Sequence, residues 1–381
     1  MIQLKGKFTD ARIMCMGDEP GANGNIEPYA LAQIQMIADN EASRGSDICV
    51  MPDVHPGKVG PIGLTMTIKD SVLPSLVGID IGCGMSMVRL GRIKKDFQKL
   101  DTVIRDNIPA GFKIRSYAHN MADEFDPADL RCAQYIKTQS AFFSLGTLGG
   151  GNHFIEVDED ENGDTYLIVH SGSRHLGKEI AEYYTNKGHK MLKETGREDV
   201  PYEMAFLTGD HLADYIHDTQ VAQEYADLNR RIIIRDICKG MKWKPQEESS
   251  CIHNYIDLSG DTAILRKGAI SAKENEPVII PINMRDGIIL GRGKGNPAWN
   301  MSAPHGAGRV ASRQDILNTH TISEFKASMK GIYSSCIGKG TLDEAPFAYR
   351  NLDYIREAVK ETVDIERIIT PVYNFKGGNE S

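Results

Sequence analysis

Three observations in this chain of 381 residues predict an α+β fold with central β-sheets flanked by helices. Short apolar runs typical of strands occur in clusters, the helical segments are long and irregularly spaced, and no regular strand–helix alternation is present. No internal repeat, low-complexity tract or linker divides the sequence. We therefore expect a single domain over residues 1–381, with its functional site at glycine-flanked strand ends.

The bulk properties of the chain exclude several classes of protein. No run of about 18 apolar residues is present, so we expect no contact with a membrane. The first residues lack the apolar core of a secretion signal. The seven cysteines have no CxxC spacing, which argues against a disulfide framework and a zinc ribbon. These features predict a cytoplasmic protein with reduced thiols.

In the first half of the chain, apolar periodicity and Pro28 in the first turn predict a helix over 27–44. A second helix is expected over 127–140, where Asp126 is placed to cap the first turn. A loop is expected at 51–58. Strands are expected at 47–51, 64–68, 76–80 and 85–90.

In the second half, a glycine-rich loop at 145–157 leads into a strand. This loop is neither a Walker A loop nor a dinucleotide-binding fingerprint, because no Gly-Lys-Ser/Thr follows and no helix begins there. Further strands are expected at 166–170, 251–257, 278–281 and 288–290, and helices at 179–195, 211–239, 351–362 and from residue 314.

Five residues on or beside these strands are candidate metal ligands: Asp80, Cys83, His153, His170 and His253. They are too many for a structural zinc site, which is closed by four ligands. They suffice for two metals if the Cys83 thiolate bridges, and two-metal centres stabilise the attacking and leaving oxygens of phosphoryl transfer. A thiolate favours zinc, iron or cobalt over manganese, so ligand type leaves the metal open.

A further histidine, His305, lies in a glycine-containing segment that ends at Arg309. An imidazole can act as a nucleophile and form a covalent phosphoramidate, whose phosphate a nearby cation would stabilise. Although the net charge is −8, this part of the chain is locally cationic. Its basic residues are Arg285, Arg292, Lys294, Arg309 and Arg313, against the single acid Asp286.

Seven motifs follow one another between residues 51 and 309. They are MPDVHPGK at 51–58, GIDIGCGM at 78–85, LGGGNHFIE at 148–156, HSGSR at 170–174, HNY at 253–255, RGKGNP at 292–297 and HGAGR at 305–309. With DEAPFAYR at 343–350 and the later Lys376-Gly377, this series resembles the RtcB family of RNA ligases across nearly the whole chain.

The resemblance implies an enzyme that joins RNA 3′-phosphate or 2′,3′-cyclic phosphate ends to 5′-hydroxyl ends, in RNA repair or tRNA splicing. GTP would be the co-substrate and two Mn²⁺ ions the cofactors, and an archease-type activator is a possible partner. GMP would be attached to His305 and then to the RNA, as RNA(3′)pp(5′)G. Two alternatives stay open: a metal-dependent hydrolase of RNA 2′,3′-cyclic phosphates that does not ligate, and a non-catalytic RNA-binding paralogue.

The matching motifs also imply a role for each site residue. Asp80, Cys83 and His153 would hold one manganese, while Cys83, His170 and His253 would hold the other. Asp53 would orient His305, and Arg174 and Arg309 would bind RNA phosphates. Residues implied to contact the nucleotide are Asn152, Phe154, Glu156, Asn254, Ser302, Gly306, Ala307, Tyr349 and Lys376.

The sequence departs from the family pattern at three points. INMRDG at 282–287 stands where many members carry a Gly-Ser-Met-Gly loop, Pro304 precedes His305, and Gly-Asn-Glu-Ser follows Lys376-Gly377. These departures suggest a divergent bacterial paralogue dedicated to RNA repair.

Overall fold

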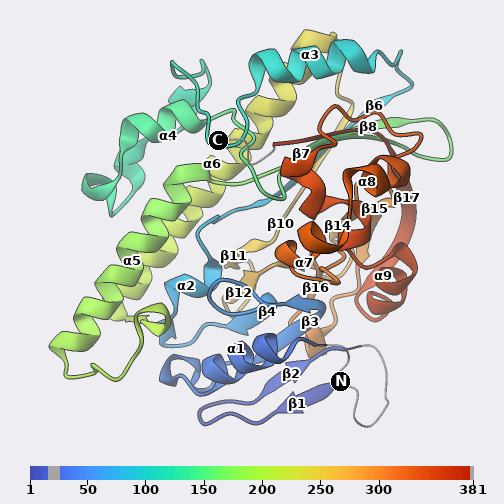
Figure 1. The fold of residues 1–381 in the computed structure, drawn as a ribbon. Helices are drawn as coiled ribbons and strands as arrows, with labels where there is room; N and C mark the ends of the chain where they lie inside the picture. The colour runs from blue at the N-terminus through green and yellow to red at the C-terminus, as the bar shows by residue number, and fades with distance from the viewer. Residues whose placement is uncertain (16–25, 378–381) are drawn as a thin grey trace.

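The computed structural model describes residues 1–15 and 26–377, and Figure 1 shows that two large β-sheets form its centre. The first sheet has the strand order β1 (Ile2–Leu4), β2 (Ala11–Ile13), β3 (Ile48–His55), β4 (Ile62–Thr67), β12 (Ile264–Lys267), β11 (Asn254–Asp257). The second has the order β10 (Glu247–Ile252), β6 (Gly84–Gly91), β8 (Thr165–Ser171), β7 (Phe154–Glu159), β17 (Val363–Lys376), β15 (Gly287–Gly293), β14 (Pro277–Asn283).

Two small sheets accompany the large ones. They pair β13 (Ala269–Ser271) with β16 (Ser302–Pro304), and β5 (Ser71–Val72) with β9 (Leu207–Thr208). Among the described strand pairs, only β2 with β3 is parallel, and every other pair is antiparallel. The predicted α+β class is therefore confirmed, because parallel βαβ units do not build this fold.

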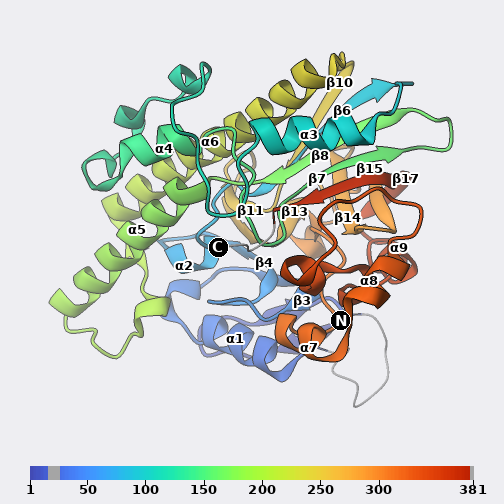
Figure 2. The same cartoon turned by 45° about the horizontal axis from the view of Figure 1, so that its top comes forward.

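Helices lie on both sides of the sheets, and the turned view in Figure 2 shows α4 to α6 opposite α7 to α9. Their bounds are α1 (Pro28–Ala38), α2 (Pro74–Val77), α3 (Phe97–Asn107), α4 (Thr138–Ser144), α5 (Arg174–Glu194), α6 (Gly209–Met241), α7 (Arg313–Thr319), α8 (Ile322–Ser328) and α9 (Leu352–Ala358). None of the helices in the described part of the chain combines the length and apolarity needed to cross a membrane.

The longest helix, α6, contacts both large sheets and fixes the loops between them. Arg230 on this helix is fully buried and donates hydrogen bonds to Ser86 Oγ at 3.0 Å, the Gly82 carbonyl at 2.8 Å and the Ser171 carbonyl at 3.0 Å. Asn229 beside it donates to the Gly172 carbonyl at 3.1 Å. This helix therefore holds the start of β6 and the end of β8 in one position.

Two sequence predictions of secondary structure were wrong. The strand expected at 76–80 is the short helix α2 followed by a turn, because Pro74 starts a helical turn and Gly78 takes a φ of 90°. The helix expected at 127–140 is replaced by short 3₁₀ turns and α4. In this segment, the buried Asp218 carboxylate accepts hydrogen bonds from the backbone N–H groups of Arg131 and Cys132. A continuous helix would have used these N–H groups for its own backbone hydrogen bonds.

Three other elements differ from expectation in ways that shape the site. The expected loop at 51–58 is strand up to His55, so Asp53 lies on β3. The single strand expected at 251–257 is two strands, β10 and β11, which belong to different sheets and are separated by His253. The long strand β17 was not predicted at all.

Candidate active site

The five predicted metal ligands come together where the two large sheets meet. Cys83 directly precedes β6, His153 precedes β7, and His170 lies on β8. His253 occupies the break between β10 and β11, and Asp80 lies in the turn after α2. Segments that are far apart in sequence thus meet at one edge.

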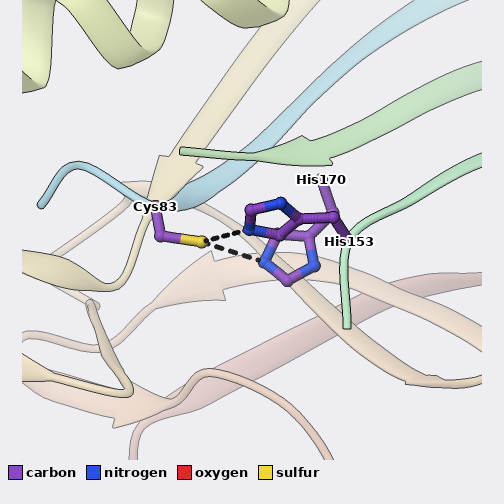
Figure 3. A group of neighbouring side chains, drawn as sticks. All are labelled: Cys83, His153 and His170. Atoms are coloured by element: carbon purple, nitrogen blue, oxygen red, sulfur yellow. Dashed lines mark hydrogen bonds between the residues drawn. The ribbon is translucent and has the colours of Figure 1, made fainter. Parts of the chain in front are cut away.

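Figure 3 shows the centre of this group, in which the side chains of His153 and His170 both point at Cys83. The Cys83 Sγ lies 3.4 Å from Nε2 of each histidine, and all three side chains are buried. One candidate ligand atom from each of the three lies within 4.8 Å of the others. Asp80 Oδ2 adds a carboxylate oxygen 2.9 Å from His153 Nε2.

The donor set fits a divalent cation. His153 Nδ1 is hydrogen-bonded to the Leu148 carbonyl at 2.8 Å and His170 Nδ1 to the Asn152 carbonyl at 3.2 Å, which leaves both Nε2 atoms free to act as ligands. The Asp80 Oδ1 atom is buried without a hydrogen-bond partner. Burial and the neighbouring Asp80 raise the pKa of the Cys83 thiol, so binding a cation would release a proton.

Glycines make the close approach of these side chains possible. A Cβ on Gly172 would lie 2.2 Å from Asp80 Oδ1. At Gly149, where φ is 90°, a Cβ would lie 1.9 Å from Arg174 Nη1 and 2.8 Å from His153 Nδ1. Any larger residue at either position would displace a candidate ligand.

His253 links this group to the candidate nucleophile. Its ring centroid lies 5.1 Å from that of His170 and 4.9 Å from that of His305. Burial and the surrounding histidines hold the pKa of His253 well below its ordinary value, so its imidazole is neutral, as a metal ligand must be.

His305 forms a dyad with Asp53. His305 Nδ1 lies 2.8 Å from Oδ2 of Asp53, which is fully buried on β3. A carboxylate that accepts a hydrogen bond from the Nδ1–H group fixes the tautomer in which Nε2 carries a free lone pair. The arrangement therefore fixes the orientation of the His305 ring, and the role of its Nε2 as a nucleophile stays a prediction.

A pocket next to His305 contains most of the predicted nucleotide contacts. Its lining includes Asn152, Phe154, Glu156, His170, His253, Ile282, Asn283, Met284, His305, Gly306, Ala307, Arg309, Tyr349 and Lys376. Residues 282–284, which belong to the INMRDG segment that differs from the family pattern, thus border this pocket. Burial raises the pKa of Glu156 above its ordinary value.

Two predicted nucleotide contacts lie elsewhere. Ser302 is buried on β16, where its Oγ bonds Arg266 and the Asn300 carbonyl. Asn254 borders a different pocket, and its side chain accepts a hydrogen bond from Gly268 N at 2.9 Å. Neither residue lines the pocket next to His305.

Sequence reasoning missed the buried acid Glu344, which organises three of the predicted contacts. Its carboxylate accepts hydrogen bonds from Lys376 Nζ at 3.1 Å and from the Tyr349 hydroxyl, and it pairs with Arg309 at 3.5 Å and with Arg313. Burial opposes ionisation, but Lys376 and Arg313 outweigh it and lower the pKa of Glu344 to about 2. In the sequence, Glu344 is the second acid of the motif DEAPFAYR.

Lys376 keeps its place in the pocket despite the residues that follow it, because it is buried and paired with Glu344. The Gly-Asn-Glu-Ser segment itself, at 378–381, lies outside the described residues.

The expected cationic patch is absent from the described residues, because its basic side chains pair with Asp286 of the same segment and with acids from other elements. The pairs are Arg285–Asp286, Arg292–Glu366, Lys294–Asp364, Arg309–Glu344 and Arg313–Asp343. Arg309 also donates to the Asp343 carbonyl at 2.6 Å. The guanidinium of Arg309 is thus part of the wall of the pocket beside His305.

A second pocket, of about 560 Å³, borders the metal-ligand group at Asp80 and His153. Arg174 lines it, with the unusual φ of 56°, and is held by hydrogen bonds to Thr147 Oγ1 at 3.2 Å and the Gly111 carbonyl at 3.1 Å. No carboxylate in the described residues lies within ion-pair distance of Arg174. Strained backbone conformations cluster at active sites and ligand clamps, and a guanidinium that lines a pocket can bind an anion.

An α+β fold with a buried Cys–His group beside a histidine dyad defines a candidate metalloenzyme. The family model described as "tRNA-splicing ligase RtcB" matches residues 33–138 and 121–377. The chain therefore belongs to the RtcB family of RNA ligases, as its motifs indicated.

Individual relatives cover nearly the whole chain. The RNA-splicing ligase RtcB of Escherichia coli (strain K12) is 30% identical over 367 residues, which is 87% of this chain and 90% of that protein. RNA-splicing ligase RtcB2 of another Escherichia coli strain is 27% identical over 92% of this chain and 91% of its own length. The tRNA-splicing ligase RtcB of Nanoarchaeum equitans is 26% identical over 86% of this chain and 87% of its own.

Proposed function

We propose that this protein ligates RNA, joining 3′-phosphate or 2′,3′-cyclic phosphate ends to 5′-hydroxyl ends with GTP as co-substrate and two Mn²⁺ ions. The observation that carries the proposal is the His305–Asp53 dyad, whose imidazole ring lies 4.9 Å from that of His253. A nucleophile at this distance from a metal-ligand group can attack a phosphate that the group helps to neutralise.

The first step is nucleotidyl transfer to His305. Its Nε2 attacks the α-phosphorus of GTP, a P–N bond forms, and pyrophosphate leaves with the electron pair of the broken P–O bond. Asp53 keeps the proton on Nδ1 and stabilises the positive charge that develops on the ring, since it accepts the Nδ1 hydrogen bond. Asn152, Phe154, Glu156, Gly306, Ala307, Tyr349 and Lys376 would hold the nucleotide.

The second and third steps use the RNA ends. An oxygen of the RNA 3′-phosphate attacks the GMP phosphorus and releases His305, giving a pyrophosphate-linked GMP on the RNA. The 5′-hydroxyl oxygen then attacks the 3′-phosphorus and loses its proton to water, while GMP leaves with the electron pair of the broken P–O bond. A 2′,3′-cyclic phosphate would first be opened by water. We assign Arg174 to an RNA phosphate, because it lines the second pocket beside Asp80 and His153 and makes no ion pair among the described residues.

The donor set supports two adjacent cation sites. Asp80, Cys83 and His153 would hold one cation and Cys83, His170 and His253 the second, with the thiolate shared. Bound Mn²⁺ would neutralise charge on the crowded phosphates and favour displacement.

Incubation with α-labelled GTP and Mn²⁺ tests the proposal. The protein should acquire a covalent label that His305→Ala abolishes, whereas His211→Ala, which changes a histidine at the start of α6, should be labelled normally. No label with any divalent metal would contradict ligation through His305. Opening of cyclic phosphates in the absence of GTP, with no joined product, would indicate the hydrolase instead. Binding of RNA with no reaction would indicate an RNA-binding paralogue.

A further inference from the structure

An exposed aromatic side chain stands at the mouth of the second pocket. Phe112 is 85% exposed, although a phenyl ring gains free energy from burial. It lines the pocket together with Ile114, which is 43% exposed. Ile79, which is 50% exposed, lines the same pocket, so these three side chains form one exposed apolar patch. Such a patch indicates a contact surface for a ligand.

The backbone that carries Phe112 is fixed to the active site. The Gly111 N–H donates to the Gly149 carbonyl at 2.9 Å, and the Lys113 N–H closes a turn onto the Ala110 carbonyl at 3.3 Å. Arg174 donates to the Gly111 carbonyl, directly before Phe112. The ring is therefore presented by a turn that is tied both to the glycine loop before His153 and to Arg174.

The charges along the pocket favour a polyanion. Arg174 has no carboxylate partner in the described residues, and Lys178 makes only a long, exposed contact of 3.7 Å with Glu182. At the inner end lie Asp80 and His153, which belong to the candidate metal group. The volume of about 560 Å³ is within the range of ligand pockets.

We propose that Phe112 is a stacking platform for an unpaired base at an RNA end, whose phosphate binds Arg174 and Lys178. Aromatic faces accept any base, and the charged side chains of Arg174 and Lys178 can donate charge-assisted hydrogen bonds to a phosphate. This inference rests on the proposed function, because it assigns the second pocket to the RNA while the pocket beside His305 receives the nucleotide. It predicts that a single-stranded overhang binds better than a blunt duplex end, whose terminal base is already stacked and paired.

The test measures binding of two short, labelled, single-stranded RNAs to the full chain by fluorescence anisotropy. One RNA ends in a 3′-phosphate and the other in a 5′-hydroxyl with its 3′ end blocked. Phe112→Ala should weaken binding of at least one of them by about 5- to 150-fold. Phe112→Trp should restore binding, Phe112→Leu should not, and Tyr29→Ala, which removes a 62% exposed aromatic on α1, should leave binding unchanged.

The RNA that loses affinity identifies the end that the platform receives. In Phe112→Trp, RNA should also quench the new tryptophan, which a merely structural role would not produce. If Phe112→Ala and the unaltered protein bind both RNAs equally well, the proposal that Phe112 stacks on a base is overturned. The same result is expected if a protein partner covers this ring. Self-guanylylation of the unaltered protein, measured in parallel, separates the two proposals: its absence contradicts only the ligase mechanism.

Discussion

The carboxylate of Glu344 is buried among Lys376, Arg309 and Arg313, and its ionised form balances their charge. Replacing one partner of a buried ion pair leaves the others uncompensated, so Glu344→Gln should lower the free energy of unfolding by about 3 kcal/mol. It should also raise the KM for GTP, because Lys376 and Tyr349 lose their common partner. Urea unfolding and initial-rate kinetics would measure the two effects.

The same residue predicts a dependence of stability on pH. Because its pKa falls from an ordinary value of 4.5 to about 2 in the folded protein, Glu344 stabilises the fold above pH 4.5 and loses this effect as the pH falls toward 2. The difference in unfolding free energy between the unaltered protein and Glu344→Gln should therefore shrink over that interval. A difference that stays constant from pH 7 to pH 3 would contradict this assignment.

Gly172 tests the packing of the metal-ligand group. Its added Cβ would lie 2.2 Å from Asp80 Oδ1, so Gly172→Ala should push this carboxylate away and weaken Mn²⁺ binding at least tenfold in a calorimetric titration. Gly260→Ala is the matched control, since the nearest atom to its Cβ is 3.9 Å away. Equal metal affinities in both variants would show that Asp80 does not hold the cation.

At the level of elements, α6 supports the candidate metal-ligand group through hydrogen bonds that Arg230 donates. Arg230→Met removes the donors to the Gly82 and Ser171 carbonyls, which flank Cys83 and His170 in sequence. We expect a loss of about 3 kcal/mol in unfolding free energy, because buried carbonyls are left without partners, together with weaker metal binding. A variant that is destabilised but binds Mn²⁺ normally would show that α6 supports only the core.

Local sequence patterns predicted the elements that depend on local physics. The periodicity of α6 and the apolar run of β8 are examples. The residues of the candidate metal group could be proposed because unusual residue types stood beside glycines. The short α2 and the interrupted segment at 127–140 were not predictable, because Pro74, Gly78 and the distant Asp218 decide them. Glu344 was missed for a similar reason: its cations Arg309, Arg313 and Lys376 come from two separate segments of the chain.

At the scale of the whole molecule, α6 touches both large sheets, and His253 lies where the chain passes from one sheet to the other. We therefore predict that residues 1–381 unfold as one domain, with calorimetry, circular dichroism and tyrosine fluorescence reporting coincident transitions. Two separated transitions, with one sheet melting first, would contradict this prediction.

The position of β17 has a consequence for how the chain is made. This strand lies between β7 and β15, yet its residues 363–376 are synthesised long after β7 at 154–159. Until they emerge from the ribosome, the facing edges of β7 and β15 lack their partner, and unpaired strand edges invite association with other chains. A nascent chain of this protein is therefore expected to need protection by chaperones over most of its translation, and premature termination before residue 363 should yield aggregates.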